Sequence, residues 1–166
     1  MGKTTTAFAV HALTEWPVVE IETLRSVADD EDVAWDWAQR VWRAWDAPEL
    51  TPPHVGIWVS TGYNWREQVV WTLSPPRYVM RVWLTANPAT LQARWRSRPA
   101  RDDHRGPWPF DESPYEVAQN CLAYDRGERV LPWPVDAIFR TDQAPPPEIA
   151  NQIVRQIRDL APFAGH

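Results

Sequence analysis

Short apolar stretches alternate with longer segments of helical periodicity along the whole chain. The apolar stretches are rich in β-branched and aromatic residues, which is typical of strands, and most end at a proline, glycine or polar turn. The predicted strands are 17–22, 54–60, 77–85 and 135–141. The predicted helices are 4–14, 31–46, 65–73, 114–126, one that begins at Pro88 and one that follows the prolines 145–147.

Two of these helices have clear signals in the sequence. Asp29 and Asp30 precede the helix at 31–46 and can cap its free N–H groups. Its predicted buried face consists of Ala34, Ala38, Val41, Trp42 and Trp45. The last helix carries an apolar stripe of Ile149, Ile153, Ile157 and Leu160.

The regular order of strand and helix predicts an α/β fold. Strands separated by helices pair in parallel, so the expected architecture is a three-layer parallel sheet with helices on both faces. The chain has 166 residues and shows neither an internal repeat nor a low-complexity linker, which predicts one domain spanning 1–166.

The composition narrows the classes of partner. The formal net charge of −5 and the pI of about 5.3 disfavour a general nucleic-acid or anionic-membrane surface. No apolar run reaches the length of about 20 residues that spans a bilayer. The one cysteine, Cys121, has no partner for an internal disulfide, so we expect a cytoplasmic protein.

The first residues of the chain, Gly2-Lys3-Thr4-Thr5, match the last positions of the phosphate-binding loop G-x-x-x-x-G-K-S/T. Arginine outnumbers lysine 16 to 1, and the single lysine is Lys3. A compact ammonium on a flexible stem can reach between phosphates, whereas a planar guanidinium is not equivalent there. The helix predicted to follow would point its free N–H groups at the same anion.

Three further stretches have an order that agrees with this loop. E-T-L-R at 22–25 follows a strand, L-x-x-R-x-x-x-R occupies 91–98, and "FRTDQAPPPEIANQIV" closes the chain. With GKTT they give the chain a pattern that resembles the P-loop kinases of small molecules and nucleotides. The nearest branch is that of the zeta-toxin-like and chloramphenicol-phosphotransferase-like proteins, and the resemblance covers nearly the whole chain.

The resemblance implies ATP and Mg²⁺ as cofactors and a role for each matching residue. Gly2, Lys3, Thr4 and Thr5 would bind the nucleotide, with Lys3 on the transferred phosphate and Thr4 as a ligand of Mg²⁺. Glu22 would orient or deprotonate the acceptor, and the family more often has the shorter Asp at that position.

The resemblance also implies a role for arginines at the phosphate site. Residues 94–105 hold five Arg and two Asp, and residues 99–114 would form the lid that closes over the phosphates. Arg94 and Arg98 match the family best, and their spacing of four places both on one helix face. They would stabilise charge that develops on the phosphoryl group. The acceptor would be a small hydroxyl- or phosphate-bearing molecule such as a nucleoside or nucleotide.

The sequence departs from the family at two places. Relatives often end the strand matching 54–60 with an acid that holds Mg²⁺ through water, whereas this chain has Ser60-Thr61. The family's first strand, central in its sheet, does not precede Gly2, so strands 17–22 and 54–60 should be separated by a gap from 77–85 and 135–141. Two interpretations follow. In the first, the protein starts upstream of Met1. In the second, this is the whole chain, and either the remaining strands close up or a strand from a partner fills the gap, which allows a homo-oligomer.

Two other functions stay open at this point. The chain could be a non-catalytic nucleotide-binding or protein-interaction module, which the departures favour. It could also bind nucleic acid through Arg94–Arg105 with Trp95 and Trp108 as stacking surfaces, which the net negative charge disfavours. The four histidines have no spacing typical of metal ligands.

Overall fold

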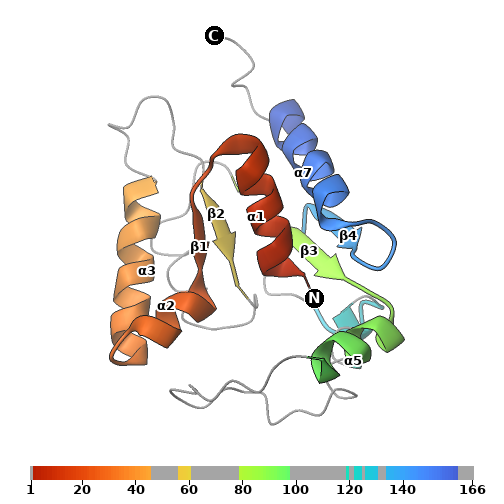
Figure 1. The fold of residues 1–166 in the computed structure, drawn as a ribbon, viewed down its shortest axis with the longest axis horizontal. Coiled ribbons are helices and arrows are strands. Elements are labelled where there is room, and N and C mark those ends of the chain that lie inside the picture. Colours follow the sequence, from red (N-terminus) through yellow and green to blue (C-terminus); the bar gives the residue numbers. More distant parts are fainter. Residues whose placement is uncertain are drawn as a thin grey trace.

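A computed structural model describes residues 2–45, 56–60, 79–97, 119, 122–124, 126–130 and 134–160 of the chain. It contains the four predicted strands and a helix, α2, that the sequence did not predict (Figure 1). The elements are α1 (Lys3–Thr14), β1 (Val18–Glu20), α2 (Ile21–Val27), α3 (Glu31–Trp45), β2 (Ile57–Val59), β3 (Val82–Thr85), α5 (Pro88–Arg96), β4 (Ala137–Arg140) and α7 (Pro146–Leu160). The fold is therefore mixed helix and strand.

The four predicted strands are present but shorter than predicted, and the last residues of the first predicted strand belong to a helix instead. We expected a strand over 17–22, yet β1 stops at Glu20 and the helix α2 begins at Ile21. Ile21 and Leu24 are one helical turn apart and pack into the same apolar cluster, which favours the helix. Glu22 consequently lies in the first turn of a helix rather than in a loop.

The helix α3 confirms its predicted start and most of its buried face. The carboxylate of Asp30 accepts a hydrogen bond of 2.8 Å from the backbone N–H of Val33, as an N-cap does. Ala34, Ala38 and Trp42 are buried as expected, and Trp35 is buried as well. The predicted helix at 65–73 lies outside the described residues, and of the one at 114–126 the described residues 119 and 122–124 are helical.

The described strands form two separate parallel sheets of two strands each. Strand β1 pairs with β2, with Val19 opposite Trp58, and β3 pairs with β4, with Leu84 opposite Phe139. The family resemblance implies the same grouping, with the first two strands apart from the last two, whereas a single three-layer sheet does not follow from two sheets of two strands.

One apolar cluster joins both sheets beneath α1 and α7. Val10 of α1 and Ile149 of α7 belong to a cluster that also takes in Ile57 of β2, Leu84 of β3 and Phe139 of β4. The next residue of β2, Trp58, points to the opposite face, where it meets Trp42 of α3 edge-on at 5.2 Å between ring centroids. Helices therefore cover both faces of the β1–β2 sheet (Figure 1).

The close approach of α3 to β2 predicts an effect of a single methyl group. A Cβ at Gly56 would lie 2.5 Å from the ring of Trp45. We expect Gly56→Ala to lower the free energy of unfolding by about 1–3 kcal/mol, because the ring must move out of a packed position. Urea unfolding measures this, and adding Trp45→Phe should recover part of the loss. An unchanged unfolding midpoint in Gly56→Ala would contradict the contact.

Among the described helices, none combines the length and the apolar character that a membrane span requires.

Candidate functional site

The start of α1 has the geometry of an anion site. Gly2 adopts a left-handed conformation with φ of 80°, which favours glycine, and its carbonyl accepts the first helical hydrogen bond from Thr6, at 2.9 Å. No side chain caps this helix end, and its first turn holds no acidic residue. The unsatisfied N–H groups and the positive end of the helix dipole are thus available to an anion.

Two residues predicted from separate stretches of the sequence meet at this helix end. The ammonium Nζ of Lys3 lies 3.3 Å from the carboxylate Oε1 of Glu22, at the start of α2. The side chains are 25% and 14% exposed, so the pair is largely shielded from water. The second oxygen of Glu22, Oε2, is buried and has no hydrogen-bond partner in the described part of the chain.

Glu20 is a further acidic residue at this site, and the sequence reasoning missed it. The hydroxyl of Thr4 donates to its Oε1, and the hydroxyl of Thr23 donates to its Oε2 at 2.8 Å. A signal was present in the alternation Glu20-Ile21-Glu22 at the end of a strand, which places two carboxylates at the sheet edge. Thr5, the last predicted loop residue, is exposed.

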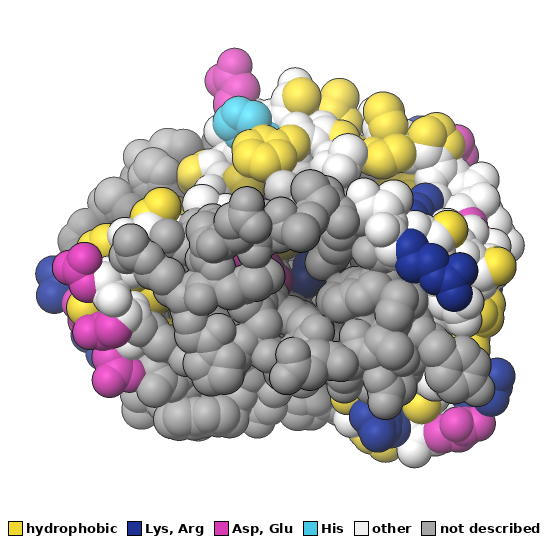
Figure 2. Space-filling model, turned by 60° about the horizontal axis from the view of Figure 1, so that its bottom comes forward, with side chains coloured by type: hydrophobic (Ala, Val, Ile, Leu, Met, Phe, Trp, Pro, Cys, Tyr) yellow, Lys and Arg dark blue, Asp and Glu magenta, His cyan; other side chains and the backbone are white. Residues whose placement is uncertain are grey.

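The strand ends gather these groups on one side of the molecule. The first turn of α1 lies at the same end of the fold as α2 and α5, which follow the carboxyl ends of β1 and β3 (Figure 1). When this end is turned forward, charged side chains of both signs are visible near the middle of the view (Figure 2). Ligands of parallel α/β sheets bind at this edge.

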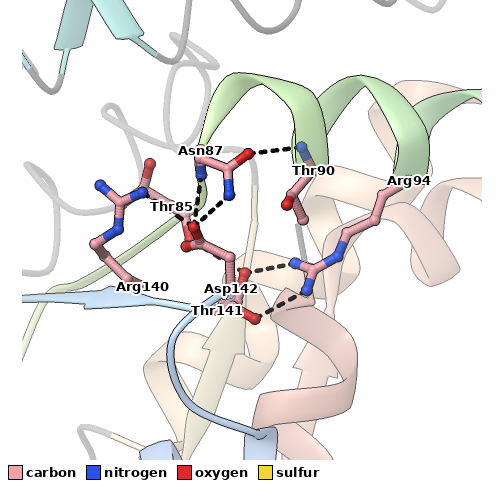
Figure 3. A network of polar contacts seen from close by, with 7 residues as sticks. All are labelled: Thr85, Asn87, Thr90, Arg94, Arg140, Thr141 and Asp142. Atoms are coloured by element: carbon pink, nitrogen blue, oxygen red, sulfur yellow. Dashed lines mark hydrogen bonds and ion pairs between the residues drawn. The ribbon is translucent and has the colours of Figure 1, made fainter.

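Arg94 ties α5 to the end of β4. Its guanidinium donates to the hydroxyl and to the carbonyl of Thr141, at 2.5 and 2.8 Å (Figure 3). Thr141 in turn donates from its hydroxyl to the carbonyl of Thr85, and its methyl lies 3.8 Å from the place a Cβ would take on Gly2. The structure thus brings Arg94 to the neighbourhood of the α1 start through Thr141. Arg98 and the lid-like segment 99–114 lie outside the described residues.

A second polar network surrounds Asp142, directly after Thr141. The Asp142 side chain is 10% exposed, and its Oδ2 accepts from Arg140 and from the backbone and side chain of Asn87 (Figure 3). Asn87 also caps α5, because its Oδ1 accepts from the N–H of Thr90 at 2.9 Å. The network therefore fixes the start of α5 against the end of β4.

The Arg140 guanidinium lowers the pKa of Asp142 from 3.8 to about 2, and the hydrogen bonds from Asn87 act in the same direction, while burial opposes them. Because the folded pKa lies below the unfolded value, the carboxylate stabilises the fold above about pH 4, and this contribution is lost as the pH falls toward 2.

We therefore expect Asp142→Asn to lower the free energy of unfolding at neutral pH by about 1–3 kcal/mol, the range for hydrogen bonds to a charged group. The variant should also lose stability less steeply than the unaltered protein between pH 4 and 2. Urea unfolding across this pH range measures both effects. The control is Asp36→Asn, which removes an exposed i,i+4 ion pair with Arg40. Identical pH profiles for all three proteins would contradict the prediction.

The described residues contain no group of three or more His, Cys, Asp or Glu side chains that could hold a metal ion. His11 faces the end of its own helix, where Nδ1 lies 2.8 Å from the carbonyl oxygen of Trp16. Strand β2 ends at Val59 and the next residue is Ser60. The position directly after this strand therefore carries no carboxylate, as the sequence indicates.

No protein-family model matches the sequence, and no curated protein is similar enough to it to be called a relative.

Proposed function

We propose that this protein is an ATP-dependent phosphotransferase of the P-loop kinase type, acting on a small hydroxyl- or phosphate-bearing acceptor such as a nucleoside, a nucleotide or a related metabolite. The observation that carries the proposal is the meeting of Lys3 with Glu22 at an uncapped helix start. An ammonium, free backbone N–H groups and a carboxylate are then available within one site for phosphate and acceptor.

Phosphate binding rests on the first turn of α1. The left-handed Gly2 brings the backbone close to the ligand without a side chain in the way, and the helix N–H groups stabilise phosphate oxygens. Lys3 would then neutralise the β- and γ-phosphates, as its place directly after the glycine indicates.

The residues beside Lys3 fit a hard divalent cation. The hydroxyl of Thr4 and the carboxylate of Glu20 are already in contact, and both are oxygen donors of the kind that Mg²⁺ prefers. Thr4 and Glu20 would hold the ion, which would supply neutralisation of the phosphate charge. Glu20 thereby provides the acidic group that Ser60, at the end of β2, does not.

In the transfer step, the acceptor hydroxyl oxygen forms a bond to the γ-phosphorus of ATP while the bond from that phosphorus to the bridging oxygen of ADP breaks. Glu22, which lies beside Lys3, takes the proton of the hydroxyl. Arg94 reaches this neighbourhood through Thr141, and Arg98, four positions further along the sequence, lies outside the described residues. Both arginines would stabilise the phosphoryl charge in the transition state.

The arrangement of the elements supports the same proposal at the level of the fold. Parallel pairing of β1 with β2 and of β3 with β4, with α1 and α7 packed over both sheets, is compatible with a three-layer P-loop kinase. The first strand of that fold has no counterpart among the described residues.

The test is a calorimetric titration of the whole chain with Mg-ATP, followed by a coupled assay of ADP release with a panel of small alcohols, nucleosides and nucleotides. Saturable binding and acceptor-dependent ADP release are expected. Binding with no ADP release from any acceptor would favour the alternative of a non-catalytic nucleotide-binding module, which the missing acid after β2 supports. No binding of Mg-ATP would overturn both.

A further inference from the structure

The loop side chains that would contact phosphate and metal are both held by carboxylates in this structure. Glu22 pairs with Lys3, and Glu20 accepts from Thr4. Two negative charges therefore stand beside one positive charge at the helix end where an anion would bind. An anionic ligand must displace the Glu22 carboxylate from the Lys3 ammonium before it gains the full electrostatic attraction of that ammonium.

The Lys3–Glu22 pair is placed so that it competes effectively. Both side chains are mostly shielded from water, so their attraction is screened less than that of a surface pair. Glu22 also begins α2, where the positive end of the helix dipole stabilises its carboxylate whether or not Lys3 is present. Glu22 keeps this stabilisation by the helix dipole when it releases Lys3.

We propose that Glu22 is an internal competitor that occupies Lys3 until a multiply charged phosphate chain replaces it. A carboxylate brings one negative charge, so an anion with a single charge gains little by displacing it. A di- or triphosphate chain presents several charges to Lys3 and to the helix N–H groups at once, and displaces Glu22 with a net gain. This inference rests on the proposed function, because it assigns competition with the phosphate donor to the same site.

The exchange of partners has a consequence for the order of events. When phosphate takes Lys3, the Oε1 atom of Glu22 becomes available for an acceptor hydroxyl, whereas before that it is engaged by the ammonium. Glu22 therefore becomes a free base only after the phosphate donor is bound, and the donor should bind first.

The test compares Glu22→Gln with the unaltered chain, with inorganic tripolyphosphate and Mg-ATP as probes in calorimetric titrations. Glutamine keeps the shape of the side chain and removes its charge, so we expect tripolyphosphate to bind about five- to tenfold more tightly, the gain that corresponds to loss of a competing ion pair. Inorganic monophosphate, which the unaltered chain should bind far more weakly than tripolyphosphate, should gain by a similar factor, because both anions are relieved of the same competition for Lys3.

The matched control is Glu15→Gln, which removes the same charge at the far end of α1, about 18 Å along the helix. It should leave the affinity for tripolyphosphate unchanged within about twofold at physiological salt. Circular dichroism and thermal unfolding of Glu22→Gln verify that α2 is retained.

The outcomes separate this inference from the proposed function. If Glu22→Gln binds tripolyphosphate more tightly and Glu15→Gln does not, the competition between Glu22 and phosphate is supported. If the chain does not bind Mg-ATP in the same experiment, the proposed function fails while the competition is retained. Binding of Mg-ATP to the unaltered chain with no gain in Glu22→Gln would overturn the inference and leave the function in place. Equal gains in Glu22→Gln and Glu15→Gln would also overturn it, since net charge alone would then explain them.

Discussion

Lys3→Ala is expected to weaken Mg-ATP binding by at least about 30-fold and to bring ADP release below detection. Removing the charged partner of a phosphate from a desolvated site costs about 2 kcal/mol or more, which sets this lower bound. The site has no substitute cation of the same kind, because Lys3 is the single lysine of the chain. Titration calorimetry and the coupled ADP assay measure the two effects.

The fold should tolerate this change. Lys3 makes one ion pair, and Glu22 stays in the first turn of α2 after the pair is lost, where the helix dipole stabilises its carboxylate. Thermal unfolding of Lys3→Ala should therefore match that of the unaltered chain within a few degrees. Lys3→Arg is the conservative companion, and we expect only partial recovery because the planar guanidinium does not replace the ammonium between phosphates. Retained turnover in Lys3→Ala would contradict the proposed role.

Ile149→Ala is expected to lower the free energy of unfolding by about 2–5 kcal/mol, the range for truncating a buried large aliphatic side chain. Ile149 has no exposed surface and lies in the cluster with Val10 of α1 and Phe139 of β4. Its truncation leaves a cavity where two helices and a sheet meet. The measurement is urea unfolding monitored by tryptophan fluorescence, and a fixed m-value would show that the same surface unfolds.

The same substitution at another isoleucine supplies the control. Ile138 in β4 is 62% exposed, so Ile138→Ala removes the same atoms without opening a cavity. It should change the free energy of unfolding by no more than about 1 kcal/mol, through β-propensity alone. Equal losses at the two positions would show that the cluster beneath α1 and α7 is not the main core of the protein.

The two phosphate-site variants are expected to act in opposite directions. Lys3→Ala removes the group that attracts the phosphate chain, whereas Glu22→Gln removes the group that competes for it. If both variants bound tripolyphosphate less well, the carboxylate would be part of the phosphate site rather than its competitor. The pair of measurements thus distinguishes attraction from competition at one ion pair.

The alternation of apolar and periodic segments was enough to predict the described helices and strands with the exception of α2. Such patterns are local, since a period of two or of 3.6 residues is set by the geometry of the backbone itself. Asp30 as the cap of α3 and the stripe of Ile149 and Ile153 on α7 belong to this class and are confirmed. The prediction of an anion site at Gly2 and Lys3 likewise used only neighbouring residues, and it stays a prediction.

Contacts between distant segments could be seen only in the tertiary structure. The helix α2 starts at Ile21, against the prediction of a strand to 22, because Ile21 and Leu24 find a cluster supplied by α3 and β2. Glu20 gained its place in the site only when the end of β1 came to rest beside Thr4. The engagement of Arg94 by Thr141 joins residues 47 positions apart. The sequence thus determined which residue types and local elements are present, whereas packing between elements decided which charges face one another, since pairing of that kind depends on positions that no local period encodes.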